Sequence, residues 1–265
     1  IDVAVFKELA EGRKVYLDYA RNPEGFDRDS LTPLARLQKI NLPVVEWLKK
    51  HGVDLEKGDK LEVFPAVQHF QGGIKIQREG ETTLKGLYAC GECAGGQHGA
   101  NRPGGNALLD SQVFGKIAGQ NAALEAGKTV EHKPGSHARS QVESYAAKLK
   151  SVASEGVPAS AARQKVQQIS SRYASVVRER HGLDKGIDEL REIKNNGISV
   201  DKNGLTYLIE TMNIVDVAEI ILNACRIRTE SRGPHLRFNN LEENKPVPRD
   251  DENWHKYVVI KKNMD

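Results

Sequence analysis

The sequence predicts an α+β fold, with a strand, a glycine-rich loop and a helix in its first half and a bundle of helices in its second. Two observations support this prediction. Within "GLYACGECAGGQHGANRPGGNALLDSQVFGKIAG", residues 86–119, an apolar run gives way to glycines and then to apolar positions at helical spacing. From residue 138 onward, several segments of helical period are separated by Gly or Pro.

The first 67 residues alternate between helical and extended patterns. The pattern predicts, in chain order, a helix over 2–11 ended by Gly12, a strand over 14–20, a helical stretch interrupted at Pro43 and ended by Gly52, and a strand over 60–67. A hairpin is expected next, with strands over 74–78 and 86–90 and a turn over 79–81.

A long helix should begin near Asn106 and end near 125, because its apolar positions recur at helical spacing. Residues 125–137 have the composition of a linker. The chain then predicts about four antiparallel helices, an irregular C-terminal region and a short strand over 257–261.

Composition excludes several classes of function. A net charge of +3, with basic residues scattered among acidic ones, argues against a nucleic-acid surface. No apolar run approaches the roughly 18 to 20 residues of a membrane span. Three cysteines do not make a disulfide framework, so a reducing, cytoplasmic setting is expected. Cys90 and Cys93 form a C-x-x-C, but only Cys225 remains elsewhere and a structural zinc needs four ligands, so no metal site is expected.

The glycine loop has the properties of a ligand cradle. Gly91 and the glycines that follow it lack a Cβ, so a flat or phosphorylated ligand can approach the backbone. The N–H groups at the start of the next helix would face an anion or an electron-rich ring edge. Glu92 could accept hydrogen bonds from sugar hydroxyls, and Arg102 could pair with a carboxylate. A purely structural strand-loop-helix turn is the alternative.

The same residues resemble a known family. The segment 86–119 is similar to the C-terminal flavin-binding segment of the succinate dehydrogenase and fumarate reductase flavoproteins, a family that includes L-aspartate oxidase and the adenylylsulfate reductase α subunit. Pro103 stands where that family usually has Leu. "RTESRGPHLRFN", "PRDDENWHKYVVI" and "VYLDYARNP" resemble further segments of the family, in the same order.

The resemblance implies a domain organisation. Residues 1–60 would be the end of a capping domain, 61–127 the C-terminal segment of a Rossmann-like FAD-binding domain, 138–228 a helical bundle domain and 229–265 a C-terminal region. The family's G-x-G-x-x-G half would precede these residues, in the same or a separate chain, because the present sequence has no such motif.

The resemblance also implies FAD as cofactor and hydride transfer between flavin and a dicarboxylate. Glu92 matches the family residue that holds the FAD ribose, and Arg102 matches the residue that clamps a substrate carboxylate. The cofactor-binding residues it implies are Gly91, Glu92, Arg102, Gly105, Asn106, Ala107 and Leu108. For His98, a structural role in the loop and a catalytic one both remain open.

One part of the pattern departs from the family. In "PAVQHFQGG", residues 65–73, an ungapped comparison places Gln68 on the family's substrate-binding His and His69 on its Tyr, whereas a shift of one residue gives His69 the substrate role. Gln can donate a hydrogen bond but cannot carry the positive charge of His. Gln68, His69 and Arg102 are therefore the candidate substrate-binding residues.

Several alternatives stay open. The family's general-acid Arg would lie upstream of Ile1, so the catalytic residue is not identified and this chain alone is expected to be inert. The resemblance implies a partner with iron–sulfur clusters, and a protein that is cytoplasmic or held at a membrane surface by its partners. A different substrate, as in L-aspartate oxidase, an electron-transfer FAD subunit of an iron–sulfur complex, and a non-catalytic scaffold are the competing functions.

Overall fold

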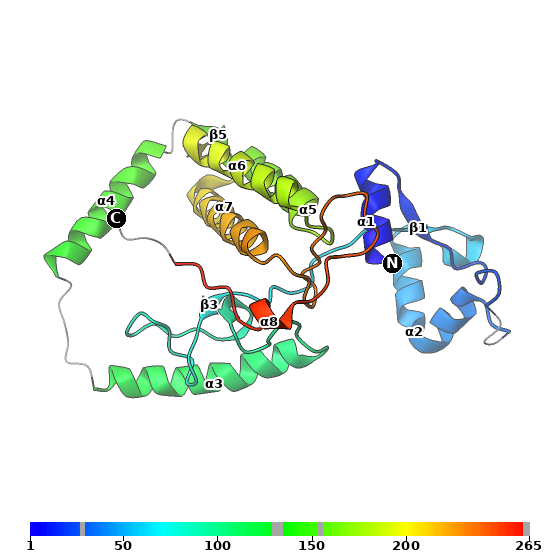
Figure 1. Ribbon diagram of the computed structural model, residues 1–265, viewed down its shortest axis with the longest axis horizontal. Coiled ribbons are helices and arrows are strands. Elements are labelled where there is room, and N and C mark those ends of the chain that lie inside the picture. Colours follow the sequence, from blue (N-terminus) through cyan, green and yellow to red (C-terminus); the bar gives the residue numbers. More distant parts are fainter. Residues whose placement is uncertain (27–29, 129–134, 153–155, 262–265) are drawn as a thin grey trace. The chain divides into compact units, whose positions relative to one another are not determined.

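The structure, a computed structural model, describes residues 1–26, 30–128, 135–152 and 156–261. The chain divides into two compact units, Ile1–Ala66 and Val67–Asp265, which are taken separately (Figure 1). The fold is mixed and rich in helices, as expected. Within the described ranges, no helix has the length and apolar character needed to cross a membrane. Of the expected linker over residues 125–137, residues 129–134 lie outside the described residues.

The described residues of the first unit form two α-helices, a short 3-10 helix and a two-stranded sheet. Its elements are α1 (Asp2–Ala10), β1 (Val15–Leu17), α2 (Pro33–Lys50), the short 3-10 helix η1 (Leu55–Lys57) and β2 (Leu61–Val63). β1 and β2 pair antiparallel, with Val15 opposite Val63. Both strands are shorter than the ranges expected from the sequence. For β2 the reason is Pro65, which has no N–H to extend the ladder.

Helix α2 bends where the sequence predicts an interruption. Asn41, two residues before Pro43, has φ −153° and ψ 68° inside the helix. A proline ring crowds the preceding turn and removes one helical hydrogen bond, which accounts for the bend. The Thr32 hydroxyl caps the first turn by accepting from the Ala35 N–H.

The expected hairpin is wrong in its pairing. β3 (Ile74–Lys75) pairs in parallel with β4 (Ala94–Gly95), not with residues 86–90. The chain reverses instead between Glu81 and Tyr88, which form an antiparallel bridge. The turn therefore lies over 83–86, where the Thr82 hydroxyl accepts from the Leu84 N–H and Gly86 takes φ 81°.

Glycines allow β3 and β4 to meet. A Cβ on Gly73 would overlap the Cys93 carbonyl oxygen, and one on Gly95 would lie 2.7 Å from the Gly73 nitrogen. The 3-10 helix η2 (Gly91–Cys93) leads into β4, and the glycine loop then leads into α3 (Asn106–Ala126). Helix α3 thus starts where the sequence predicts.

Among the described residues, the second half of the chain contains four longer helices, as the sequence predicts. These are α4 (Ser136–Val152), α5 (Ala159–Tyr173), α6 (Arg180–Asn196) and α7 (Gly204–Ile227), with the short parallel strands β5 (Val157–Pro158) and β6 (Ile198–Ser199) between them. The main buried cluster comes from α5, α6, α7 and β6 alone among the described residues. The packed core is therefore three helices rather than four.

The C-terminal region returns to the glycine loop. The Tyr257 hydroxyl donates to the Gly96 carbonyl at 3.0 Å, and Gly233 lies directly against the Ala100 carbonyl. The only helix here within the described residues is α8 (Asp251–Trp254). The strand expected over 257–261 is absent from these described residues, which have no assigned helix or strand.

Candidate functional site

The candidate site is built on backbone that only glycine adopts easily. Gly91, Gly96, Gly99 and Gly105 have φ of 68°, 116°, 63° and 83°. A Cβ at Gly96, Gly99 or Gly105 would meet no atom within 4 Å. Their lack of side chains therefore serves backbone conformation and leaves open space beside the loop, which suits a ligand that lies close to the main chain.

The first turn of α3 offers N–H donors without a side-chain cap, although the Asn106 N–H itself donates to the Pro103 carbonyl at 3.2 Å. Its N-cap residue, Gly105, offers no side-chain acceptor. The N–H groups of the first helical turn have no partner within a helix, and the helix dipole adds partial positive charge there. Ala107 and Leu108 thus supply backbone donors suited to an anion or an electron-rich ring edge.

Glu92 lies on η2 at the entrance to the loop. One of its carboxylate oxygens, Oε1, accepts from the Phe70 N–H at 2.9 Å, and the side chain is exposed. The hydrogen bond joins the segment before β3 to the segment before β4. It orients the carboxylate and leaves the second oxygen without a bond to any described residue.

Arg102 is held by its backbone rather than by a carboxylate. Its N–H donates to Gln71 Oε1 at 2.6 Å, and Gln71 Nε2 donates to Asn101 Oδ1 at 3.0 Å. The guanidinium donates through Nη1 to the Pro103 carbonyl, while its buried Nε has no hydrogen-bond partner. No ion pair to Arg102 occurs within the described ranges, so the guanidinium keeps donors for a ligand.

Gln71 is a residue that sequence reasoning missed. Its side-chain amide spans the strand segment and the glycine loop through the two bonds above. Its position directly before Gly72-Gly73 gave a weak signal, but nothing in the sequence shows which residues lie opposite.

The two candidate substrate residues before β3 differ in environment. Gln68 is exposed, whereas His69 is half-buried and its Nδ1 is sealed from solvent. The His69 ring meets the His98 ring edge to face, with centroids 5.9 Å apart. The structure therefore brings His69, not Gln68, to the glycine loop.

Behind these rings lies a buried acid that sequence reasoning also missed. Asp110, one turn into α3, is 3.5 Å from His98 Nε2 through its Oδ2. Gln97 Nε2 donates to the same oxygen at 3.3 Å. Asp110 is a charged residue next to the apolar residues Leu108 and Leu109 in α3. That contrast was the one feature of the sequence that could have indicated a buried acid.

The C-terminal region supports the loop from outside. Besides the Tyr257 and Gly233 contacts, His235 accepts from Arg178 at Nδ1 (2.9 Å), with Nε2 at 3.2 Å from the Arg228 carbonyl oxygen. Burial, and then the charge of Arg178, lower the pKa of His235 to about 4. The imidazole is therefore neutral near pH 7, so that Nδ1 can accept from Arg178 while the Nε2 N–H donates to the Arg228 carbonyl.

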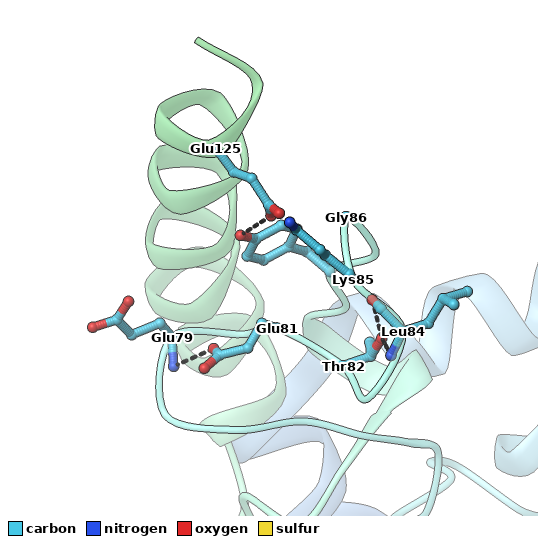
Figure 2. Close-up of a pocket in the computed structure, with 8 residues that line it drawn as sticks. Glu79, Glu81, Thr82, Leu84, Lys85, Gly86 and Glu125 are labelled. Carbon is cyan, nitrogen blue, oxygen red and sulfur yellow. Dashed lines mark hydrogen bonds between the residues drawn. The ribbon is translucent and has the colours of Figure 1, made fainter. Parts of the chain in front are cut away.

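A surface pocket elsewhere has a different character. Figure 2 shows it between the 81–88 turn and the C-terminal end of α3, where Tyr88 donates to Glu125 at 2.7 Å. That hydrogen bond raises the pKa of Tyr88. Glu79, Glu81 and Lys85 also line the pocket, and none of the candidate site residues does.

The C-x-x-C does not assemble a metal centre in the part of the chain that the structure describes. Cys90 is half-buried, Cys93 is exposed and Cys225 is buried in the helical core. No group of three or more His, Cys, Asp or Glu side chains is placed to hold a metal among the described residues. The Cys93 thiol donates to the Cys90 carbonyl at 3.2 Å.

Two models of known protein families match segments of this chain. A family model described as an FAD binding domain matches residues 3–108, which include the glycine loop and the start of α3. A model described as the C-terminal part of fumarate reductase flavoproteins matches residues 163–265. The chain belongs to the fumarate reductase and succinate dehydrogenase flavoprotein family.

Individual members of this flavoprotein family match along nearly the whole chain. An uncharacterised FAD-dependent oxidoreductase of Methanocaldococcus jannaschii is 33% identical over 97% of the chain and 45% of the relative. One subunit of the fumarate reductase (CoM/CoB) of Methanothermobacter marburgensis is 30% identical over 99% of the chain and 46% of the relative. The chain thus spans about half the length of these curated relatives.

The fold matches as well. The solved structure of Mycobacterium smegmatis Sdh1 in complex with UQ1 superposes with a TM-score of 0.78 and 26% identity, covering 94% of this chain and 41% of that one. The present chain therefore shares both the sequence pattern and the fold of the family.

Proposed function

We propose that the protein is an FAD-dependent oxidoreductase that acts on a dicarboxylate, with succinate or fumarate as the first choice. The observation that supports it best is one arrangement: open glycine backbone and the free first turn of α3, flanked by the exposed carboxylate of Glu92 and the incompletely paired guanidinium of Arg102. Membership of the flavoprotein family indicates that the ligand of this arrangement is FAD.

The residues present fit FAD. Glu92, held by the Phe70 N–H, would accept hydrogen bonds from ribose hydroxyls with its remaining oxygen. Gly91 and Gly105 keep the backbone close, and Ala107 and Leu108 would present N–H groups to an electron-rich ring edge, whereas the expected Asn106 N–H already donates to the Pro103 carbonyl at 3.2 Å. FAD, when bound, supplies two-electron exchange with a substrate carbon.

Two side chains would hold the dicarboxylate. Arg102 would pair with one carboxylate through donors that no described carboxylate occupies. His69 would donate to the other carboxylate, because it lies at the glycine loop while Gln68 faces outward. A general acid is not assigned to any residue of this chain.

Electron transfer to a partner belongs to the same proposal. We expect an iron–sulfur protein to exchange electrons with the flavin, and attachment to a membrane surface, if present, to come through partner subunits. A relative of known structure, 26% identical to this chain, is described as the Mycobacterium smegmatis Sdh1 complex, which supports the expectation of partner subunits.

The test uses the protein expressed in full. We expect it to purify with a flavin visible spectrum, to reduce fumarate with a reduced viologen dye and to oxidise succinate with an artificial acceptor. Purification without flavin would favour the scaffold function. If the protein contains flavin but acts only on L-aspartate, its function is that of an aspartate oxidase and the substrates are not succinate and fumarate.

Arg102 provides the sharpest variant. Arg102→Lys keeps a positive charge but loses the planar fork, so kcat/KM should fall by about 100-fold or more, with flavin retained. Arg139→Lys, on an exposed position of α4, is the matched control and should leave kcat/KM unchanged. Equal activity in Arg102→Lys and the wild type would contradict the assignment of the carboxylate clamp.

A further inference from the structure

A group of buried polar atoms behind His69 lacks hydrogen-bond partners. The side chains of His98 and Asp110 are only 8% and 5% exposed. His69 Nδ1, His98 Nε2, Asp110 Oδ1 and Gln97 Oε1 are all buried without a hydrogen-bond partner among the described residues. Native proteins leave few such atoms, and each costs free energy, so a concentration of them calls for a functional account.

The geometry gives these groups an order. Asp110 lies on α3 and meets the Nε2 side of His98 at 3.5 Å. The ring of His98 meets the ring of His69 edge to face at 5.9 Å between centroids, with an interplanar angle of 77°. The chain of contacts therefore runs from a rigid helix, through one imidazole, to the residue proposed to hold the substrate.

His69 presents its two ring nitrogens differently. Nδ1 is sealed against the protein, while Nε2 is not buried and makes no hydrogen bond to a described residue. His98 therefore restrains the His69 ring, and Nε2 of His69 remains available to a ligand. A ring turned over about its Cβ–Cγ bond would exchange Nε2 with Cε1 and Nδ1 with Cδ2, and would put a C–H group in place of the donor on the substrate side.

We propose that Asp110 and His98 form a positioning pair for His69, in which the buried carboxylate orients His98 and the His98 ring holds the His69 imidazole with Nε2 toward the substrate. This inference rests on the proposed function. Burial of a carboxylate is costly unless it is paired, which is why Asp110 is expected to act through His98 and Gln97. Closer contacts are expected in the substrate-bound protein, since such bonds are often long without ligand.

A purely structural role predicts something different. If Asp110 only stabilised the loop, its removal would reduce stability and flavin content and would act independently of His69. A positioning role predicts full flavin content and an effect that disappears when His69 is already replaced, because the two residues act through one group.

The experiment is a double-mutant cycle in the protein expressed in full. Asp110→Asn keeps size and removes charge, and kcat/KM for fumarate should fall about 10- to 100-fold. In a His69→Gln background the same change should alter kcat/KM by less than about 2-fold. Asp110→Glu restores the carboxylate and should recover much of the loss. Binding of malonate, an unreactive dicarboxylate, followed by the flavin spectrum, should weaken in parallel.

Glu125→Gln is the control. It makes the same carboxylate-to-amide change on α3, at the far end from the glycine loop, and Gln can still accept from Tyr88. We expect no change in kcat/KM or malonate binding.

Three outcomes would overturn the inference. They are loss of flavin in Asp110→Asn, equal losses in the wild-type and His69→Gln backgrounds, and no loss at all. If Asp110→Asn does not fold, His98→Gln with and without His69→Gln makes the same comparison, and additive losses there overturn it. If the wild type binds FAD but turns over no dicarboxylate, the proposed function and this inference are overturned together. If the wild type is active and the losses in kcat/KM from the two substitutions simply add, only the inference is overturned.

Discussion

Glu230 is a buried carboxylate outside the glycine loop. Its carboxylate is 1% exposed and accepts from Arg228 at 2.6 Å and from the Asp250 N–H at 2.6 Å, and also from Arg232. Burial raises its pKa, but the hydrogen bonds from Arg232, Asp250 and Arg228 outweigh this and lower the pKa to about 2. The residue ties the end of α7 to α8.

Its stability contribution should depend on pH. Because the folded pKa lies below the ordinary value of 4.5, the contribution is complete above pH 4.5 and is lost as the pH falls toward 2. Glu230→Gln should lower the free energy of unfolding by about 3 kcal/mol at neutral pH, since two guanidinium groups lose their buried partner. Urea unfolding at neutral pH and near pH 4 measures the difference, which should shrink at the lower pH.

Glu252→Gln is the control at the residue scale. Glu252 is exposed on α8, and the same substitution there should change the free energy of unfolding by less than about 0.5 kcal/mol at either pH. A loss for Glu230→Gln that does not vary with pH would contradict the electrostatic account.

At the scale of elements, the parallel pair β3–β4 brings the two halves of the candidate site together. Ile74 lies opposite Ala94, and the pairing places Phe70 and Gln71 beside Glu92 and Arg102. The approach is close because Gly73 faces the Cys93 carbonyl oxygen.

Two adjacent glycines test this pairing. A Cβ at Gly73 would overlap backbone, whereas a Cβ at Gly72 would meet nothing within 4 Å. Gly73→Ala should cost about 2 kcal/mol of stability and reduce flavin content, and Gly72→Ala should cost less than about 1 kcal/mol and retain flavin. Thermal unfolding and flavin absorbance of the purified variants measure both. Equal behaviour of the two variants would show that the close approach does not matter.

At the scale of the whole molecule, the C-terminal region stabilises the glycine loop across a long separation in sequence. Gly233 packs on the Ala100 carbonyl and Tyr257 donates to the Gly96 carbonyl. The segment that follows the α5–α7 core therefore contacts the candidate site, and substitutions in that segment should weaken FAD binding at the site.

Gly233 and Gly204 provide a matched pair for this contact. Both have positive φ, 56° and 85°, so Ala at either position costs about 1 kcal/mol of backbone strain. Only at Gly233 would the added Cβ overlap backbone of the loop, while Gly204 has open space. Gly233→Ala should raise the Kd for FAD by about 10-fold or more, and Gly204→Ala by less than about 2-fold, in flavin titrations of the apoprotein. Similar Kd values for the two variants would mean that the contact does not support the loop.

The sequence by itself determined the elements whose signals are local. Gly12 and Gly52 end helices and Pro43 bends one, because single residues set these backbone angles, and the start of α3 at Asn106 follows from glycines giving way to helical spacing. The motif around Gly91–Glu92 and Arg102 identified the family for the same reason.

Only the tertiary structure decided which segments meet. The pairing of β3 with β4 in place of a hairpin, the choice of His69 over Gln68 at the loop, and the burial of Asp110 beside His98 all depend on residues distant in sequence. No local pattern encodes such contacts. A strand can pair with many other strands and a polar side chain can bond to many partners, and only the packing of the folded chain selects one of them.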